Sequence, residues 1–236
     1  MRTLLLNGCS FGKCWTPSQN FVEKLGCDTV VNLSKVATSF QRTYRSTIEW
    51  IAQNGKPSFI IIPITFYHRW ELGIAKNDDP IDGVWFPLKM ANVLPDDLNT
   101  LDRKIDPSVN HGKLKKLLEL YYGTIPDIRP YCDKMFSEII TLSAFLHQQN
   151  IPHLMFDMCN NFDRALVDKW TAFEKVKFIH HNKNIIDLFK FCGNKEMWNS
   201  QNNKENNNFN IHHKPEQYLV LEAYLEQYMK QNSIIQ

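Results

Sequence analysis

A serine and a histidine lie near opposite ends of this chain, in segments that favour nucleophilic chemistry. Ser10 belongs to the segment LLLNGCSFG, residues 4–12, in which a short apolar run ends in small residues. Such a run predicts a buried strand that leads into a tight turn, at the strand end where open α/β sheets bind ligands. His213 lies in the segment NIHHKP, residues 210–215, before the last predicted helix. A serine hydroxyl needs a base to become a nucleophile, so the two residues together predict acyl transfer.

This layout resembles that of the SGNH (GDSL-type) hydrolases, which carry a serine after the first strand and a histidine before the last helix. The Gly-Cys-Ser-Phe block at residues 8–11 is most similar to members from viral and marine-bacterial genomes. The resemblance implies a serine esterase in which Ser10 attacks the acyl carbon and His213 acts as base and then as acid. It implies no cofactor and no metal. His212 is the alternative base.

The residue that orients the histidine differs from the family pattern. The family usually has an aspartate three positions before the histidine, where this chain has Asn210. A neutral amide stabilises an imidazolium poorly, and the analogous change in a serine protease lowers turnover by about 10⁴-fold. Either Asn210 orients His213, or another acid such as Glu205 or Glu216 does, or a backbone carbonyl holds the ring.

The donors implied for the oxyanion also depart from the pattern. By resemblance they are the backbone N–H groups of Ser10 and Ala37 and the hydroxyl of Thr65, where the family has serine, glycine and asparagine. Alanine keeps the N–H group, whereas the threonine hydroxyl reaches less far than an asparagine amide. Loss of one such donor lowers the rate on the order of 10²–10³-fold. The sequence therefore allows an active esterase or a catalytically impaired protein of the same shape.

Three further residues are candidates for binding the substrate. Arg69, just past the third predicted strand, can hold a carboxylate or phosphate with two hydrogen bonds, although an internal pair with Glu71 is the alternative. Arg42 is expected near the cleft, and Trp70 is a candidate aromatic wall, although large aromatics are more often core residues. The expected substrate is a small-molecule or carbohydrate ester, for which an acetyl group on a carbohydrate is one candidate.

The elements that would position these residues alternate between strands and helices. The pattern predicts a doubly wound parallel sheet, and the resemblance implies a three-layer α/β/α, flavodoxin-like fold over a single domain, residues 1–236. Apolar runs place strands at 3–7, 27–33, 59–62, 152–158 and 176–179. Helical periodicity places helices from a cap at Thr38 or Ser39 to about residue 54, over 137–149 and over 216–229.

Residues 72–130 interrupt this alternation. They contain six prolines and one clear helical pattern, over 113–122. A long segment between a strand and a helix is usually an insertion near a site, so a lid is expected. A structural cap without substrate contact is the alternative.

Composition excludes several classes of protein. Of the 236 residues, 43% are hydrophobic, which is enough for a core. The formal net charge of +2 demands neither a nucleic-acid nor a membrane partner. No apolar run approaches the roughly 20 residues that span a bilayer. The apolar run at the start of the chain is too short for the core of a signal peptide. A cytoplasmic protein is expected, and the oligomeric state is left open. The six cysteines include no pair at zinc-ligand spacing, and Cys9 is expected to pack at the strand end.

Residues 7–14, NGCSFGKC, also come close to a P-loop. That motif requires glycine first and Ser or Thr after the lysine, and here Asn7 and Cys14 fill those positions. Pro17 interrupts the helix that should follow. A P-loop nucleotide enzyme therefore remains only a minor alternative.

Two other readings belong to different classes. An SGNH-shaped binding or structural protein would have the fold without the reaction. Metal catalysis would need histidines and an acid brought together by folding, although neighbouring histidines on an extended chain point to different sides. The candidate ligands are His180, His181, His212, His213 and Asp157.

Overall fold

The computed structural model describes ten stretches of the chain, and side chains within seven of them. The backbone is described for residues 1–35, 38–64, 69–76, 79–89, 112–113, 116–117, 119–120, 129–157, 178–179 and 215–231. Side chains are described for residues 1–9, 12–35, 38–64, 112–113, 116–117, 119–120, 133–156 and 218–231.

The centre of the molecule is a five-stranded parallel sheet with the order β2-β1-β3-β6-β7. Its strands are β1 (Thr3–Leu6), β2 (Thr29–Asn32), β3 (Phe59–Ile64), β6 (His153–Asp157) and β7 (Phe178–Ile179). Counting only these strands along the chain, the order is 2-1-3-4-5, which is the flavodoxin-like arrangement. The predicted fold class is confirmed, and all five predicted strands are present.

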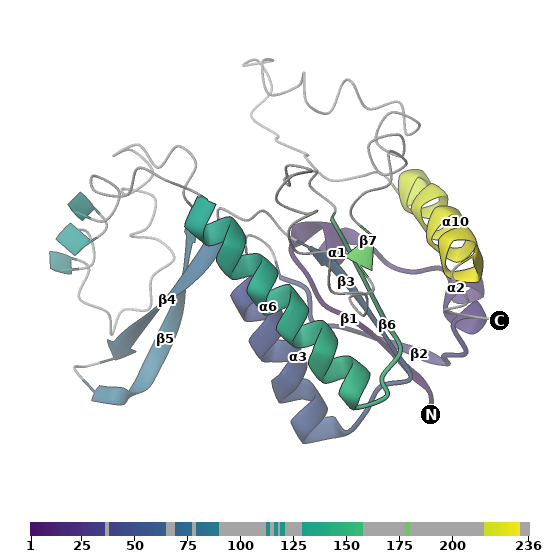
Figure 1. Ribbon diagram of the computed structural model, residues 1–236, viewed down its shortest axis with the longest axis horizontal. Coiled ribbons are helices and arrows are strands. Elements are labelled where there is room, and N and C mark those ends of the chain that lie inside the picture. The colour runs from purple at the N-terminus through teal and green to yellow at the C-terminus, as the bar shows by residue number, and fades with distance from the viewer. Residues whose placement is uncertain are drawn as a thin grey trace, which may run out of the picture.

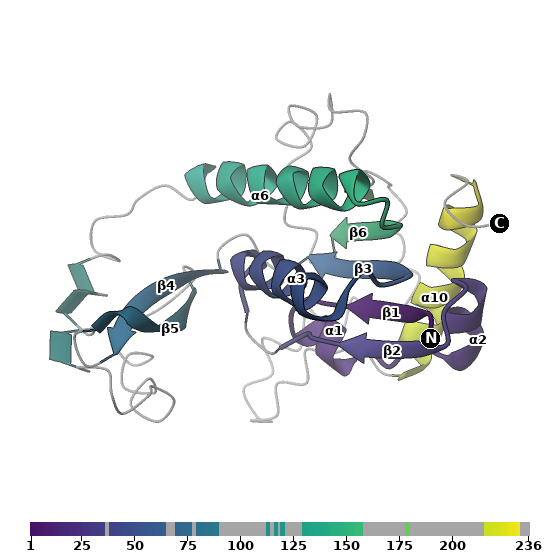
Figure 2. The same cartoon turned by 90° about the horizontal axis from the view of Figure 1, so that it is seen from below.

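Helices cover both faces of this sheet and complete three layers (Figure 1 and Figure 2). On one face lie α3 (Phe40–Asn54) and α6 (Arg129–Gln148). On the other lie α2 (Gln19–Lys24) and α10 (Pro215–Gln231), with the short α1 (Ser10–Cys14) following β1. Neither α1 nor α2 was predicted from the sequence.

Two apolar cores separate the layers, and the strands alternate between them as the pleat requires. Leu4 and Leu6 of β1 face the core under α2 and α10, whereas Leu5 faces the core under α3 and α6. All six residues of β3 are buried, because this central strand is covered on both faces.

The ends of the helices follow local chemistry. Of the two predicted caps, Ser39 is the N-cap of α3, and its hydroxyl accepts from the N–H of Arg42 at 3.1 Å. Gly55 ends α3 with a φ of 84°, a conformation that favours glycine. Helix α6 begins at Arg129, earlier than the predicted start at 137, and Pro130 occupies its first turn, where proline is tolerated.

The segment predicted as an insertion contains a β-hairpin that the sequence analysis did not predict. Strand β4 (Arg69–Lys76) pairs antiparallel with β5 (Asp79–Lys89), and the hairpin extends away from the sheet (Figure 1 and Figure 2). Helical residues occur at 112–113, 116–117 and 119–120, within and next to the predicted helix 113–122. The other residues of the predicted insertion, up to the start of α6, lie outside the described residues. Whether this segment acts as a lid therefore stays a prediction.

The side chains of three cysteines are described, and none of the three forms a disulfide. Cys9 and Cys27 are buried and Cys14 is exposed. Cys9 belongs to the core under α10, as predicted. In the described part of the chain, none of the helices has the length and apolar character that a bilayer crossing requires.

Candidate active site

The candidate site lies at the carboxyl ends of β1 and β3. The chain runs from β1 to β2 on one side and later returns to β3 on the other, so this is the topological switch point of the sheet. Open α/β sheets bind their ligands in the crevice at this point. The backbone of Ser10 lies here, as the first residue of α1. The side chain of Ser10 is not among the described ones.

Two glycines let the turn before and within α1 lie close against its neighbours. A Cβ on Gly8 would lie 2.6 Å from the carbonyl oxygen of Pro63 in β3, and a Cβ on Gly12 would lie 2.6 Å from Oγ of Ser34. Both distances are too short for any larger residue without movement of the backbone or side chain. Ser10 is therefore flanked by two close contacts, one to β3 and one to the loop after β2.

The loop after β2 is fastened to the same turn. The N–H of Lys35 donates to the carbonyl of Gly8 at 3.1 Å, and the hydroxyl of Thr38 reaches the same carbonyl at 3.4 Å. Ala37 lies between these two anchors in the sequence and outside the described residues. The chain on both sides of Ala37 is thus tied to the residue two positions before Ser10.

The first turns of α10 pack against the end of α1. The ring of Tyr218 stacks on that of Trp15, with centroids 6.2 Å apart and planes 5° from parallel. Burial raises the pKa of Tyr218, with smaller contributions from the nearby thiols of Cys14 and Cys9. The described part of α10 thus packs on the side of the sheet that holds α1, and its first residue, Pro215, follows His213 by two positions in the sequence.

A buried carboxylate fixes this packing, and the sequence analysis missed it. Glu222 of α10 is 5% exposed and accepts from the indole N–H of Trp15 at 3.0 Å. It also accepts from the N–H of Ser18 at 2.9 Å and from the Ser18 hydroxyl. The signal was present in the sequence, because Glu222 follows Tyr218 by four positions and so lies on the apolar face of the helix.

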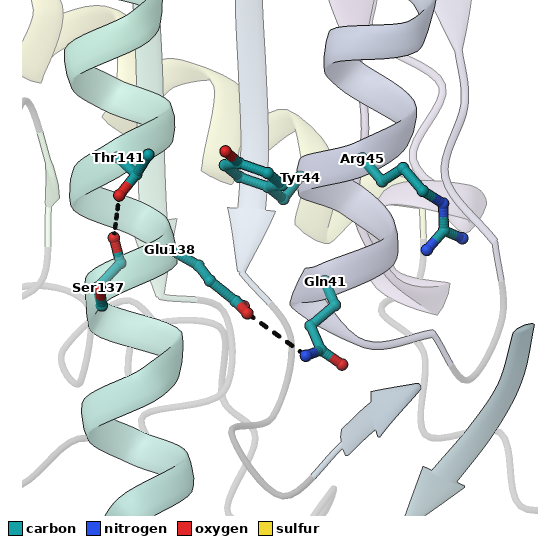
Figure 3. Close-up of a pocket in the computed structure, with 6 residues that line it drawn as sticks. All are labelled: Gln41, Tyr44, Arg45, Ser137, Glu138 and Thr141. Atoms are coloured by element: carbon teal, nitrogen blue, oxygen red, sulfur yellow. Dashed lines mark hydrogen bonds between the residues drawn. The ribbon is translucent and has the colours of Figure 1, made fainter. Parts of the chain in front are cut away.

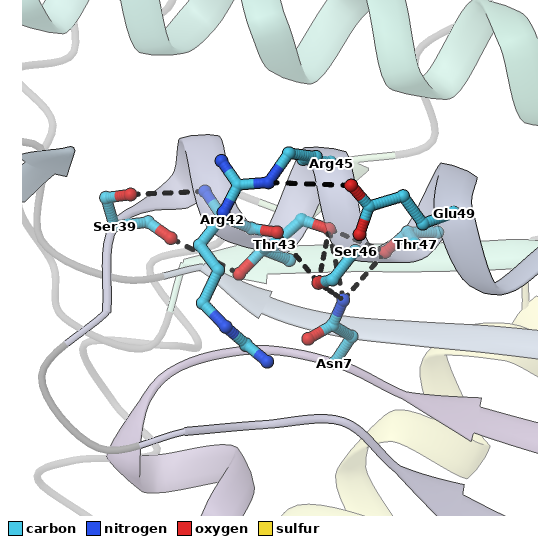
Figure 4. Close-up of polar contacts among 8 residues, drawn as sticks. All are labelled: Asn7, Ser39, Arg42, Thr43, Arg45, Ser46, Thr47 and Glu49. Atoms are coloured by element: carbon cyan, nitrogen blue, oxygen red, sulfur yellow. Dashed lines mark hydrogen bonds and ion pairs between the residues drawn. The ribbon is translucent and has the colours of Figure 1, made fainter. Parts of the chain in front are cut away.

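At the end of β1, a buried amide joins the sheet to α3 (Figure 4). Asn7 is fully buried, and its Nδ2 donates to the carbonyl of Thr43 at 3.0 Å and to the hydroxyl oxygens of Ser46 and Thr47 at 2.9 Å each. Its backbone N–H donates to the carbonyl of Ile61 in β3 at 3.1 Å. Asn7 therefore joins β1, β3 and α3 at the base of the Ser10 turn.

Of the predicted substrate-binding residues, only Arg42 has a described side chain. Its guanidinium donates to the carbonyl of Leu33, just past β2, at 3.0 Å, so it lies at the carboxyl edge of the sheet. Arg45, one turn along α3, instead pairs with Glu49 at 3.7 Å. Arg69 pairs with Lys89 and Trp70 with Leu88 in the register of the hairpin, with side chains outside the described set. The remaining predicted site residues, which are Ala37, Thr65, Asn210 and His213, lie outside the described residues.

The described side chains include a serine–histidine pair other than the predicted one, and it was not predicted from the sequence. Oγ of Ser143 lies 2.8 Å from Nε2 of His153, whose Nδ1 lies 3.0 Å from the carbonyl of Ile151. A carbonyl can only accept, so Nδ1 carries a proton, and when the ring is neutral Nε2 accepts from the serine. The two side chains are 1% and 4% exposed, and His153 begins β6 at the amino edge of the sheet. This sealed pair satisfies buried polar atoms and is inaccessible to a substrate.

A shallow cleft of about 380 Å³ lies between α3 and α6 (Figure 3). Glu138 reaches across it toward Gln41, whose Nε2 donates to the carboxylate at 3.4 Å. Burial raises the pKa of Glu138. None of the predicted site residues lines this cleft, whose lining residues are Gln41, Tyr44, Arg45, Ser137, Glu138 and Thr141.

The two minor alternatives gain no support from the described residues. Residues 10–14 are helical, whereas a P-loop wraps its backbone around phosphate over the corresponding positions before its helix starts. Among the side chains that are described, no three from histidine, cysteine, aspartate and glutamate cluster as metal ligands would. The five candidate ligands themselves lie outside that set.

Comparison with known proteins gives a likeness of fold among solved structures. No protein-family model matches the chain, and no curated protein matches it. Among solved structures, the chain is similar to the psychrotrophic esterase EstA from Pseudoalteromonas sp., inhibited by monoethylphosphonate. The TM-score is 0.46 and the identity 10%, over 98% of this chain and 100% of that chain. At these values the assignment of fold rests on the strand order alone.

Proposed function

We propose that this chain is a serine ester hydrolase of the SGNH type, with its site at the carboxyl ends of β1 and β3. One observation carries most weight: the first turns of α10 pack on the end of α1, through Trp15 and Tyr218. A nucleophile and its base must come within hydrogen-bond reach. This packing supports the proposal, because α10 begins two positions after His213 in the sequence and Trp15 directly follows the helix that Ser10 begins.

In this mechanism the hydroxyl of Ser10 attacks the acyl carbon while His213 takes its proton. His213 then returns the proton to the leaving alcohol, which leaves the acyl group on Ser10, and Asn210 holds the ring. A water molecule that His213 deprotonates attacks this acyl group, and the carboxylic acid leaves as Ser10 regains its proton. The N–H groups of Ser10 and Ala37 and the hydroxyl of Thr65 donate to the oxyanion. The two hydrogen bonds that tie the Ala37 loop to Gly8 support this arrangement, because they hold the loop beside the turn of the nucleophile.

The proposed substrate is a small acyl ester, with an acetylated carbohydrate as one candidate. Arg42 is one proposed contact, because its guanidinium lies at the carboxyl edge of the sheet. Arg69 and Trp70 begin the hairpin that follows β3 and are the other proposed contacts. The reaction needs no cofactor.

A fluorophosphonate probe tests the mechanism directly, because it labels activated serines covalently. We expect the wild type to be labelled, and the Ser10→Ala and His213→Ala variants to lose labelling. The Ser143→Ala variant is the matched control, since Ser143 contacts a histidine but is sealed in the core. Labelling that survives the loss of Ser10 would remove this mechanism.

A non-catalytic binding protein of the same shape is the second candidate. It is favoured by the residues at the three positions where the family pattern is broken, Ala37, Thr65 and Asn210. Such a protein would neither react with the probe nor hydrolyse short acyl esters.

A further inference from the structure

The buried amide of Asn7 lies three residues before Ser10 and has a geometry that packing alone does not require. Its nitrogen has two protons and three acceptors within 3.0 Å, all of them on α3. The two hydroxyl acceptors are directed by their own bonds, since Ser46 donates to the carbonyl of Arg42 at 2.7 Å and Thr47 to that of Thr43 at 2.8 Å. Their protons are thereby used, and their oxygens are free to accept from Asn7.

This arrangement fixes which way the amide points. A flipped amide would place its oxygen 3.0 Å from the carbonyl oxygen of Thr43, which can only accept, so the orientation with Nδ2 toward α3 is the compatible one. In that orientation Oδ1 is buried and has no hydrogen-bond partner among the described residues. An unsatisfied buried acceptor lowers stability, so a pair of apolar side chains would serve the core at least as well.

A directional contact that is retained at a cost in stability indicates a requirement for position. Satisfied polar networks hold one geometry, whereas apolar side chains allow small shifts. The position held here is the end of β1, from which the chain enters the turn of Ser10. The backbone N–H of Asn7 is bonded to Ile61 of β3 as well, so the same residue fixes the strand end in two directions.

We infer that Asn7 is a positioning residue for the nucleophile, which it holds by locking the end of β1 against α3. This inference rests on the proposed function and names a residue that acts through Ser10 rather than on the substrate. Misplacement of a reacting group by about 1 Å lowers rates by up to about 10²-fold. Loss of the lock therefore affects the chemical step more than the binding of substrate.

The test compares Asn7→Ala with Ser143→Ala, which breaks an equally buried polar contact at the opposite edge of the sheet. The rate of fluorophosphonate labelling, and kcat and KM for p-nitrophenyl acetate, are measured at a temperature where circular dichroism shows both variants folded. We expect Asn7→Ala to lower the labelling rate and kcat by about 10- to 100-fold with little change in KM. Ser143→Ala should keep the wild-type values.

Two results would overturn the inference while leaving the hydrolase intact. One is labelling of Asn7→Ala at the wild-type rate, and the other is an equal loss of rate in Ser143→Ala. If Asn7→Ala does not fold, the double variant Ser46→Ala/Thr47→Val decides, because it removes two acceptors and keeps the amide. A smaller loss of kcat is expected there, and an unchanged kcat overturns the inference. A wild type that is not labelled ends the proposed function, and the inference with it.

Discussion

Replacement of Gly8 by alanine tests whether the close contact with β3 positions the turn of Ser10. The new Cβ would lie 2.6 Å from the carbonyl oxygen of Pro63, and ordinary contact begins at 3.4 Å, so the two segments must separate by 3.4 − 2.6 = 0.8 Å. Overpacking of this kind costs about 1–3 kcal/mol. For a chain of this size that lowers Tm by roughly 2–12 °C. A shift approaching 1 Å beside a reacting group lowers the rate by tens of fold, up to about 100-fold.

The matched control is Gly26→Ala, in the turn after α2. Its Cβ would meet only the guanidinium of Arg2, at 3.9 Å, but the φ of 69° is unfavourable for alanine. That conformation costs about 1–2 kcal/mol. Both variants should therefore lose stability in thermal unfolding, and only Gly8→Ala should also lose fluorophosphonate labelling. A Gly8→Ala protein with the stability of Gly26→Ala and the labelling rate of the wild type would refute a positioning role for this contact.

Three further predictions concern the core and the surface. Ser143→Ala leaves Nε2 of His153 buried without its donor, which should lower the free energy of unfolding by about 1–3 kcal/mol in urea; an unchanged value would mean that water or another group replaces the hydroxyl. Burial raises the pKa of Glu138, so the folded state binds the proton of this carboxyl more tightly than the unfolded state does. The free energy of unfolding therefore falls as pH rises from about 4.3 through the raised pKa. Glu138→Gln should therefore be more stabilising at pH 7 than at pH 4, and an equal effect at both pH values would contradict this. Burial raises the pKa of the Cys27 thiol to about 11, whereas Cys14 is exposed. Iodoacetamide at pH 8 should therefore modify Cys14 in the folded protein and spare Cys27, which mass spectrometry of the peptides can check.

The sheet was predictable because each strand coincides with a short apolar run in the sequence. The run Phe59–Ile62 is apolar at every position, which a strand covered on both faces requires, and it is the core of β3. Ser39 followed by helical periodicity marked the start of α3 within one residue. The strand order follows from rules on connecting parallel strands, because such crossovers leave few possible arrangements.

The hairpin was missed because its prolines resemble loop residues. Pro80 and Pro87 lie in β5, and proline is tolerated in a ribbon that has only one neighbouring strand. The alternation of Trp70, Leu72 and Ile74 was the available signal for a strand. It was obscured by the expectation of a long irregular insertion.

The polar contacts of the core could not be predicted, since they join residues that the sequence separates. Asn7 and Thr47 are 40 positions apart, and Trp15 and Glu222 are 207 apart. A buried polar residue shows in the sequence as an exception in an apolar pattern, but its partner is set by the fold. The candidate site has the same limit: the strand end of Ser10 was predictable, whereas the contacts that flank it were not.

The buried contacts of Asn7 and Glu222 both lie beside the Ser10 turn, one before it in the chain and one after it. Asn7 fastens the chain just before Ser10 to α3 on one face of the sheet, and Glu222 fastens Trp15 and Ser18, just after α1, to α10 on the other. Apolar packing at either place would allow the turn to slide, because it has no preferred direction. Hydrogen bonds on both sides hold it in one place, which a site for chemistry needs and a core does not. Glu222 also fixes α10 against the end of α1, so the helix that follows His213 in the sequence is held beside the helix that Ser10 begins.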